Sequence, residues 1–280
     1  MDKYKTKMTI SKWFSFINLE KLSGKSQKAI QSFDAYVKKL TFERTLKLFL
    51  FAINDETNSL RHLDNQLVNP KLRKAIGVDE ISYSQLSRAL KALDSSVLME
   101  IFSQLLLLVH QQTEGQKNEK IYLVDSTTFS FSQPSYPWAK FRKTKSGVKL
   151  HLSVCFMEDG LLHPEQFEIS NAVEHDSDHL EVLVNKLTPK AKEIGKMYKS
   201  RWQIELFFKH IKQHMTIKKY FSKSEDGVVN QIILAMIVYL LTLLIKLELG
   251  LKQTIFQILR VFRSIQFENY DYFIRIFDPG

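Results

Sequence analysis

The 280-residue sequence contains a single cysteine, Cys155, and lacks the usual signs of secretion or membrane insertion. One cysteine excludes an intramolecular disulfide and fits a reducing compartment. The first residues, MDKYKTKMTISKWFSF, lack the apolar core of a signal peptide. The longest apolar run, IILAMIVYLLTLLI, is shorter than the roughly 18 residues expected of a membrane span. We therefore expect a cytoplasmic protein without membrane association, in which this run forms a buried helix.

The chain also lacks internal repeats, low-complexity tracts and an obvious flexible linker. Its hydrophobic content of 44% and charged content of 25% are ordinary for a soluble globular protein. At this length the chain has room for one large domain or two smaller ones.

Positive charge is unevenly distributed along the chain, whose formal net charge is +10. Between Lys186 and Lys223, ten lysines and Arg201 stand against Glu193 and Glu205, so this stretch carries +9 of the total. A second basic stretch, KFRKTKSGVK, has five positive charges and no acid. Clustered basic residues suit a polyanion, because phosphate contacts release counterions. The alternative is that these charges only increase solubility or cause nonspecific binding.

Hydrophobic spacing divides the chain into three regions. Residues 1–115 have apolar residues at spacings of three and four and are expected to be helical. Residues 116–215 begin with three segments of strand character, IYLVDSTTFSF, GVKLHLSVCFM and LLHPEQFEIS, which predict an antiparallel meander. A helix over DSDHLEVLVNKL is expected to follow. Residues 216–280 are again expected to be helical, with one helix through the apolar run and one over KQTIFQILRVFRSI.

Four polar residues are regularly spaced in the helical pattern YKSRWQIELFFKHIK. At about 100° per residue, Tyr198, Arg201, Glu205 and Lys212 fall within roughly 60° of arc on one side of the helix. Large apolar residues occupy the rest, so a largely buried helix is expected. One interpretation is a chain of internal pairs, such as Arg201 with Glu205. The other is a functional stripe that faces a ligand. Trp202 is expected to be a core residue, with stacking on DNA as the alternative.

Asp125 is the second candidate, because it stands within the apolar strand pattern IYLVDST. Burying a carboxylate there is costly unless it is paired or binds a metal. The alternative is a cap at the end of the strand. A strand aspartate together with a helical glutamate is an oxygen-ligand set that suits Mg²⁺ (or Mn²⁺) at phosphoryl-transfer sites.

These residues resemble a known family. Tyr198, Arg201, Glu205 and Lys212 match the Tyr-x2-Arg-x3-Glu-x6-Lys signature of the insertion-sequence-four family of DDE transposases. VDSTTFSF resembles that family's first catalytic segment, and PWAKFRKTKSGVKLHL and EHDSDH resemble the segments that follow. The helical first third is also similar to such transposases, so the resemblance extends over most of the chain.

The resemblance implies a ribonuclease-H-like α/β core between helical regions, with residues 1–115 binding DNA. It implies that Asp125 and Glu205 are catalytic metal ligands, and that Tyr198, Arg201 and Lys212 contact phosphates at a transposon end. Arginine suits bidentate phosphate contacts, and lysine acts as a point charge. The resemblance also implies that the chain binds DNA, that it does so as a homodimer, and that it is associated with the nucleoid.

The sequence departs from this family where the second catalytic aspartate should lie. TPKAKEIGKM leads directly into Tyr198, and ten residues cannot hold a fourth strand, its aspartate and a fifth strand. We interpret this as an internal deletion near residues 187–190. The core would then be incomplete, with the Asp125 strand left at an edge of the sheet. Two acids in place of three predict weakened metal binding and impaired strand transfer.

Other acids and histidines are weaker candidates for the missing ligand. Asp176 and Asp178 lie at the expected start of a helix, where N-capping is the simpler role. Glu158 and Asp159 are expected in a hairpin turn at the opposite end of the sheet. His151 and His175 are expected as strand and loop residues, because no Cys and His spacing suggests zinc.

Three hypotheses therefore remain open from the sequence. The chain is a Mg²⁺-dependent transposase, a deleted derivative that binds element ends without cutting them, or a remnant that folds poorly. Salt-sensitive binding to element ends would separate the second from the third.

Overall fold

The computed structural model describes residues 7–78, 80–114, 120–142, 145–157, 160–174, 191–214 and 220–277, with the side chains of 140–142, 191–201 and 214 left aside. The fold is mixed α/β, and it divides into two compact units. The helical unit comprises Met1–Glu114, His214–Ser222 and Asp226–Gly280, and the sheet unit comprises Gly115–Gln213 and Lys223–Glu225. The C-terminal helices, which the sequence analysis treats as a separate region, therefore group with the N-terminal helices.

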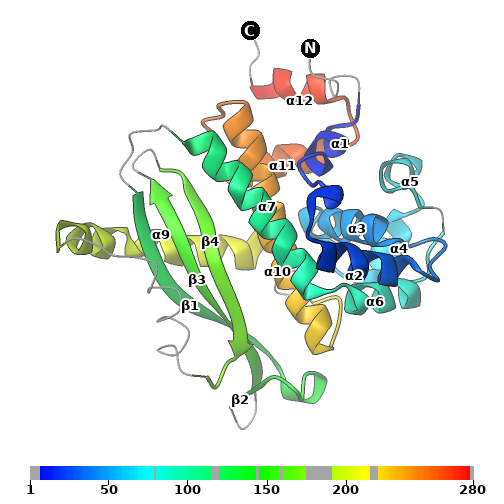
Figure 1. The fold of residues 1–280 in the computed structure, drawn as a ribbon, viewed down its shortest axis with the longest axis horizontal. Helices are drawn as coiled ribbons and strands as arrows, with labels where there is room; N and C mark the ends of the chain where they lie inside the picture. The colour runs from blue at the N-terminus through cyan, green and yellow to red at the C-terminus, as the bar shows by residue number, and fades with distance from the viewer. Residues whose placement is uncertain are drawn as a thin grey trace. The chain divides into compact units, whose positions relative to one another are not determined.

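The helical unit combines two long helices with a larger number of shorter ones (Figure 1). The described helices are α1 (Thr9–Phe14), η1 (Leu19–Lys21), α2 (Gly24–Asp34), α3 (Phe42–Asn54), α4 (Leu60–Gln66), α5 (Pro70–Ile76), α6 (Tyr83–Ala92), α7 (Ser95–Thr113), α10 (Glu225–Glu248), α11 (Ile255–Ile265) and α12 (Tyr270–Phe277). Side-chain caps begin many of them, including capping boxes at Ser82 for α6 and Thr254 for α11. These local signals explain why the helices begin where they do.

The two ends of the chain meet within the helical unit. The backbone N–H of Thr9 donates to the carbonyl of Glu268 at 2.8 Å, beside an isolated bridge between Met8 and Asn269. Trp13 of α1 is fully buried, and its ring lies 5.1 Å from that of Phe262 on α11. N-terminal and C-terminal segments thus share one hydrophobic core.

Helix α10 contains the apolar run and is buried along most of its length. At 24 residues it extends beyond that run and is long and apolar enough to cross a bilayer, so the shortness of the run does not exclude a membrane span. However, 94% of its most apolar window is buried inside the structure, as in the core helix of a globular protein. The prediction of a buried helix is confirmed.

Asn230 is a buried polar residue in α10 that holds the end of another helix. Its side-chain amide donates to the carbonyls of Leu90 and Leu93 at 3.0 and 2.9 Å, where α6 ends. We expect Asn230→Ala to lower the free energy of unfolding by about 2–4 kcal/mol, because two buried carbonyls lose these donors. Urea unfolding followed by circular dichroism measures the loss. A decrease below about 0.5 kcal/mol would show that these hydrogen bonds contribute little to stability.

The sheet unit contains an antiparallel sheet and one long helix (Figure 1). Its elements are β1 (Lys120–Ser132), η2 (Gln133–Ser135), β2 (Lys140–Arg142), β3 (Lys145–Met157), β4 (Leu162–Asn171) and α9 (Ala191–His214). Strand β3 is central, because β1 pairs with one of its edges while β4 and the short β2 pair with the other. The predicted meander of β1, β3 and β4 is confirmed, as is a helix through the polar stripe.

Strand β1 pairs with β3 alone among the described residues. It is therefore an edge strand of the described sheet, as expected from the proposed internal deletion. The expected helix over residues 176–187 lies outside the described residues. The mixed α/β class is observed, and the finer description as an incomplete ribonuclease-H-like core stays a prediction.

Candidate functional site

Asp125 lies in the middle of β1, opposite Leu152 of β3. Pairing continues for seven more residues, as far as Ser132 opposite Lys145, so the alternative of a cap at the strand end is wrong. The carboxylate is half-buried, and its Oδ1 accepts the backbone N–H of Ser126 at 2.8 Å. A carboxylate has further lone pairs beyond this bond, so Asp125 retains the capacity to bind a cation.

Helix α9 has one buried side and one exposed side. Ile204, Phe207, Phe208 and Ile211 are buried, whereas Trp202, Glu205, Lys209 and Gln213 are exposed. The expectation of a largely buried helix therefore holds for one side only. Glu205 lies on the exposed side, where a carboxylate pays little desolvation cost.

Trp202 corrects the sequence analysis, which expects a core residue. Its side chain is 63% exposed. The exposed residues Glu205 and Lys209 follow it by three and seven residues, which places them on the same side of the helix. An exposed tryptophan beside charged residues offers a flat apolar surface to a ligand.

Lys212 connects α9 to the strand that carries Asp125. Its Nζ donates to Thr127 Oγ1 at 2.6 Å and to the carbonyl of Thr128 at 3.2 Å. The ammonium also lies 5.2 Å from the centre of the Phe129 ring, a cation–π distance. Burial lowers the pKa of Lys212 below its usual value.

The contact with Thr127 places Lys212 on the same sheet face as Asp125. Side chains two residues apart in a strand point to the same face, so Asp125 and Thr127 share one face. Helix α9 crosses the sheet on that face (Figure 1). The structure therefore brings two of the predicted site residues to one side of one strand.

Glu205 precedes Lys212 by seven residues, or about two helical turns, so the two lie on nearly the same side of α9. Tyr198 and Arg201 belong to the same helix by their backbone, but their side chains lie outside the described part of the chain. The pairing of Arg201 with Glu205 and the phosphate contacts of Tyr198 and Arg201 stay predictions.

The threonines that hold Lys212 are functional candidates that the sequence analysis missed. Thr127 and Thr128 immediately follow Asp125 and Ser126, but nothing in their spacing indicates a lysine partner 85 residues away. The partner becomes visible only when α9 is placed against β1.

The donor atoms of the predicted site suit a hard divalent cation. Asp125 and Glu205 offer carboxylate oxygens, and Mg²⁺ is often held by one or two carboxylates while it keeps several water ligands. The substitutes considered from the sequence, Asp176, Asp178, His175, Glu158 and Asp159, lie outside the described residues. They neither support nor weaken the fit.

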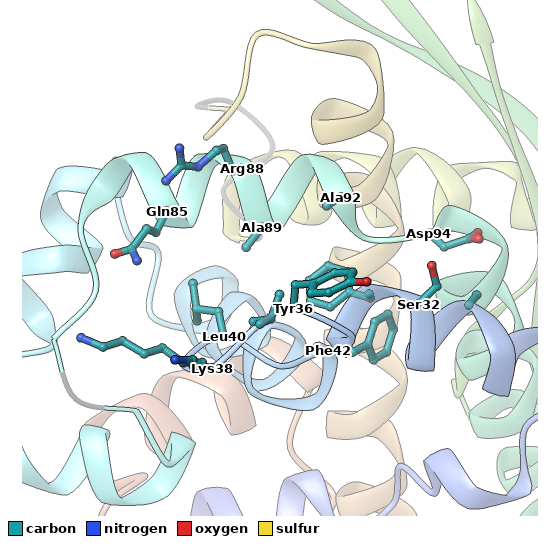
Figure 2. A pocket seen from close by; sticks show the side chains of 14 residues that line it. Ser32, Tyr36, Lys38, Leu40, Phe42, Gln85, Arg88, Ala89, Ala92 and Asp94 are labelled. Atoms are coloured by element: carbon teal, nitrogen blue, oxygen red, sulfur yellow. The ribbon is translucent and has the colours of Figure 1, made fainter.

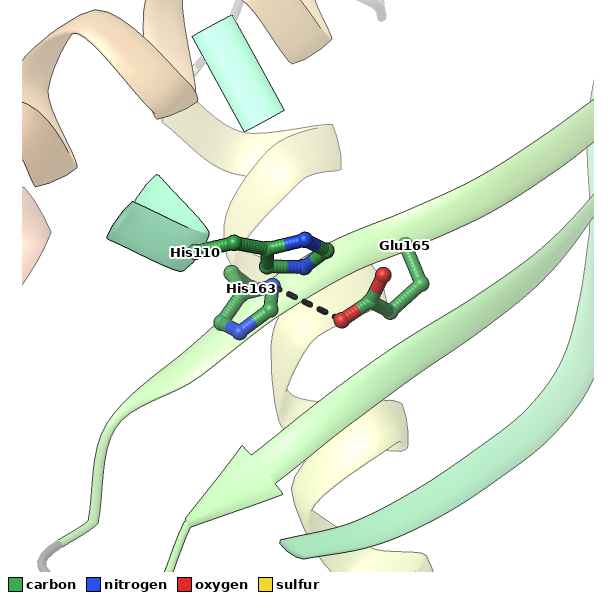
Figure 3. Close-up of side chains that lie close together, drawn as sticks. All are labelled: His110, His163 and Glu165. Atoms are coloured by element: carbon green, nitrogen blue, oxygen red, sulfur yellow. Dashed lines mark ion pairs between the residues drawn. The ribbon is translucent and has the colours of Figure 1, made fainter. Parts of the chain in front are cut away.

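The opposite face of the sheet carries a row of polar residues with no predicted role. His151 is buried, and its Nε2 lies 2.8 Å from Ser170 Oγ, which confirms it as a strand residue with a structural contact. His163 Nδ1 lies 3.5 Å from a carboxylate oxygen of Glu165 (Figure 3).

The single cysteine, Cys155, is a poor nucleophile at neutral pH. Burial, with the charge of Glu165, raises the pKa of its thiol to about 12.

Comparison with known proteins identifies a family model for part of this site. Residues 182–241 match the transposase DDE domain, and this range contains Tyr198, Arg201, Glu205 and Lys212 but not Asp125. These comparisons support a DDE transposase. A Sinorhizobium fredii protein named as a transposase is 41% identical over 66 residues, 24% of this chain and 18% of that protein.

Two further relatives carry names that refer to insertion sequences. The Geobacillus stearothermophilus protein, named as the transposase for element IS5377, is 20% identical over 290 residues, 72% of this chain and 75% of that protein. The Synechocystis protein, named as a transposase for element IS4SA, is 29% identical over 106 residues, 35% of this chain and 31% of that protein. The chain thus spans under a third of two of these relatives. No solved structure matches it significantly.

Proposed function

We propose that this chain is a transposase of an insertion sequence that binds DNA at element ends, with impaired Mg²⁺-dependent cleavage and strand transfer. The contact of Lys212 with Thr127 carries the proposal, because it joins the helix of the predicted signature to the face of β1 that bears Asp125. The transposase names of the relatives and the match to a DDE domain support it.

The residues divide the proposed task between metal binding and phosphate binding. Asp125 and Glu205 would hold Mg²⁺, which activates the attacking oxygen and stabilises the leaving oxygen of a phosphodiester. Lys212 has three donors, and two of them bond to β1, which leaves one to meet a phosphate beside Asp125. Tyr198 and Arg201 would contact neighbouring phosphates along α9.

A second candidate is a derivative that binds DNA ends without cutting them. Two observations favour it. Strand β1 is an edge strand of the described sheet, and the sequence lacks the expected segment with the second aspartate. Such a chain would occupy element ends or form mixed oligomers with an intact transposase.

Replacing Lys212 tests the phosphate-binding role. We expect Lys212→Met to weaken binding to an element-end duplex by about tenfold and to reduce the slope of log affinity against log salt by about one. Fluorescence anisotropy at four salt concentrations measures both quantities. Lys209→Met is the matched control, because it removes the same charge from an exposed position of α9.

The control separates a specific contact from general charge. Equal losses in the two variants would show that Lys212 contributes only to the overall field of the protein. Unfolding of both variants is followed in urea, because Lys212 also bonds to β1. A loss of binding together with a loss of folding in Lys212→Met alone would make its role structural.

A further inference from the structure

The helical unit contains a cavity of about 830 Å³ that no predicted role uses (Figure 2). It lies between α2 with the loop that follows it and α6 with the start of α7. Its size falls in the range of small-molecule and cofactor sites. The lining residues that matter for binding are Phe33, Tyr36, Lys38, Phe42, Arg88 and Asp94.

Aromatic rings occupy the middle of the cavity. Phe33 and Phe42 contact each other edge to face, with ring centres 5.7 Å apart, and Phe42 is buried. Tyr36 stands over the cavity (Figure 2), and its side chain is 99% exposed. A tyrosine that buries none of its ring against the protein has a full aromatic face available for stacking on a flat ligand.

The charged residues that line the cavity lie at its two ends according to sign, although Lys25, outside the lining, also acts on Asp94. Figure 2 shows Lys38, Gln85 and Arg88 at one end, and Ser32 with Asp94 at the other. The Asp94 carboxylate accepts hydrogen bonds from Ser96, which hold its pKa below the usual value, so it is ionised at neutral pH. A ligand that fits this pattern is anionic at one end, flat in the middle, and rich in N–H donors at the other.

We propose that this cavity binds a nucleotide, with its base stacked on Tyr36 and its phosphate beside Lys38 and Arg88. Stacking on an aromatic side chain tolerates any base. A carboxylate accepts hydrogen bonds but donates none, so Asp94 favours guanine, whose Watson–Crick edge presents adjacent imino and amino donors. Lys39 is not included among the phosphate-binding residues, because its Nζ donates to the carbonyl of Glu80 at 3.2 Å.

The same chemistry is available from a free nucleotide or from an unpaired nucleotide in a DNA strand. We assign the DNA source, and this part rests on the proposed function, since that function brings DNA to the chain. An unpaired base inserted here would anchor the helical unit at a distorted or single-stranded position.

The experiment measures the affinity of the full chain for three probes. They are a fully paired duplex, the same duplex with one unpaired guanine, and the free nucleotide dGMP. Anisotropy measures the two duplexes, and equilibrium dialysis measures dGMP. Tyr36→Ala is compared with Tyr36→Phe, and with Tyr83→Ala, which removes a half-exposed tyrosine of α6 outside the cavity.

We expect the wild-type chain to prefer the duplex with the unpaired guanine over the paired duplex by about tenfold. Tyr36→Ala should abolish this preference and weaken dGMP binding by about tenfold, whereas Tyr36→Phe and Tyr83→Ala should retain both. Asp94→Asn keeps a good helix cap and should reduce the preference for the duplex with the unpaired guanine over the paired duplex.

The other outcomes separate this inference from the proposed function. Binding of the paired duplex with no preference for the unpaired guanine, and no saturable dGMP binding, would overturn the inference and leave the function intact. Binding of dGMP that does not respond to Tyr36→Ala would also overturn it. Saturable, Tyr36-dependent dGMP binding without any duplex binding would keep the cavity as a nucleotide site and refute the DNA source with the function.

Discussion

Trp13→Ala is expected to lower the free energy of unfolding by about 3–5 kcal/mol, a large part of the stability of an ordinary domain. The Trp13 ring is fully buried and lies against Phe14 and Phe262, so its removal leaves a cavity where α1 packs against α11. Urea unfolding followed by circular dichroism at 222 nm measures the change.

Trp202→Ala provides a matched control on the same chain. Its side chain is 63% exposed, so its removal should change the free energy of unfolding by no more than about 0.5 kcal/mol. Acrylamide should quench the fluorescence of Trp202 far more than that of Trp13. Similar losses of stability in the two variants would contradict the assignment of Trp13 to the core and Trp202 to the surface.

The second large effect concerns transposition itself. Supplied with a marked element bearing the terminal sequences that flank its own coding region, this chain should transpose it at least about a hundredfold less often than an intact transposase moves its matched element. The reason is the second catalytic carboxylate that the sequence is expected to lack, because two ligands hold and orient a metal less well than three. Counting marker transfer to a recipient plasmid measures the frequency. Transposition at ordinary frequency would refute the impairment.

Much of the fold could be predicted because its signals are local. The strand character of residues 121–131 and the apolar spacing around α11 depend on neighbouring residues alone, and both elements form where expected. The same holds for α9, whose backbone forms the helix on which the stripe was predicted.

The incorrect or missing predictions concern residues whose burial and contacts depend on tertiary packing. Trp202 stands in an apolar segment, so its neighbours in sequence suggest a core position, but the buried side of α9 is set by Ile204 and Ile211. The charged residues at positions 205 and 209 are the signal in the sequence that marks the exposed side. The bonds from Lys212 to Thr127 and Thr128 depend on how α9 docks on β1, which no spacing reveals.

The cavity in the helical unit was missed for a similar reason. Tyr36 and Lys38 follow α2 in an irregular segment, and their relation to Arg88 and Asp94 depends on the packing of α2 beside α6. The signal present in the sequence was a tyrosine followed closely by lysines, which also occurs on ordinary surfaces.

The central claim is that this chain binds the ends of an element but does not cut them efficiently. The most direct test incubates a labelled end duplex with the chain and with Glu205→Gln, each with and without Mg²⁺, and measures binding and cleavage together. The account predicts salt-sensitive binding by both proteins and little or no cleavage by either. Efficient cleavage that requires both Mg²⁺ and Glu205 would contradict it, and would show that another acid completes the site, with Asp176 and Asp178 the first to replace.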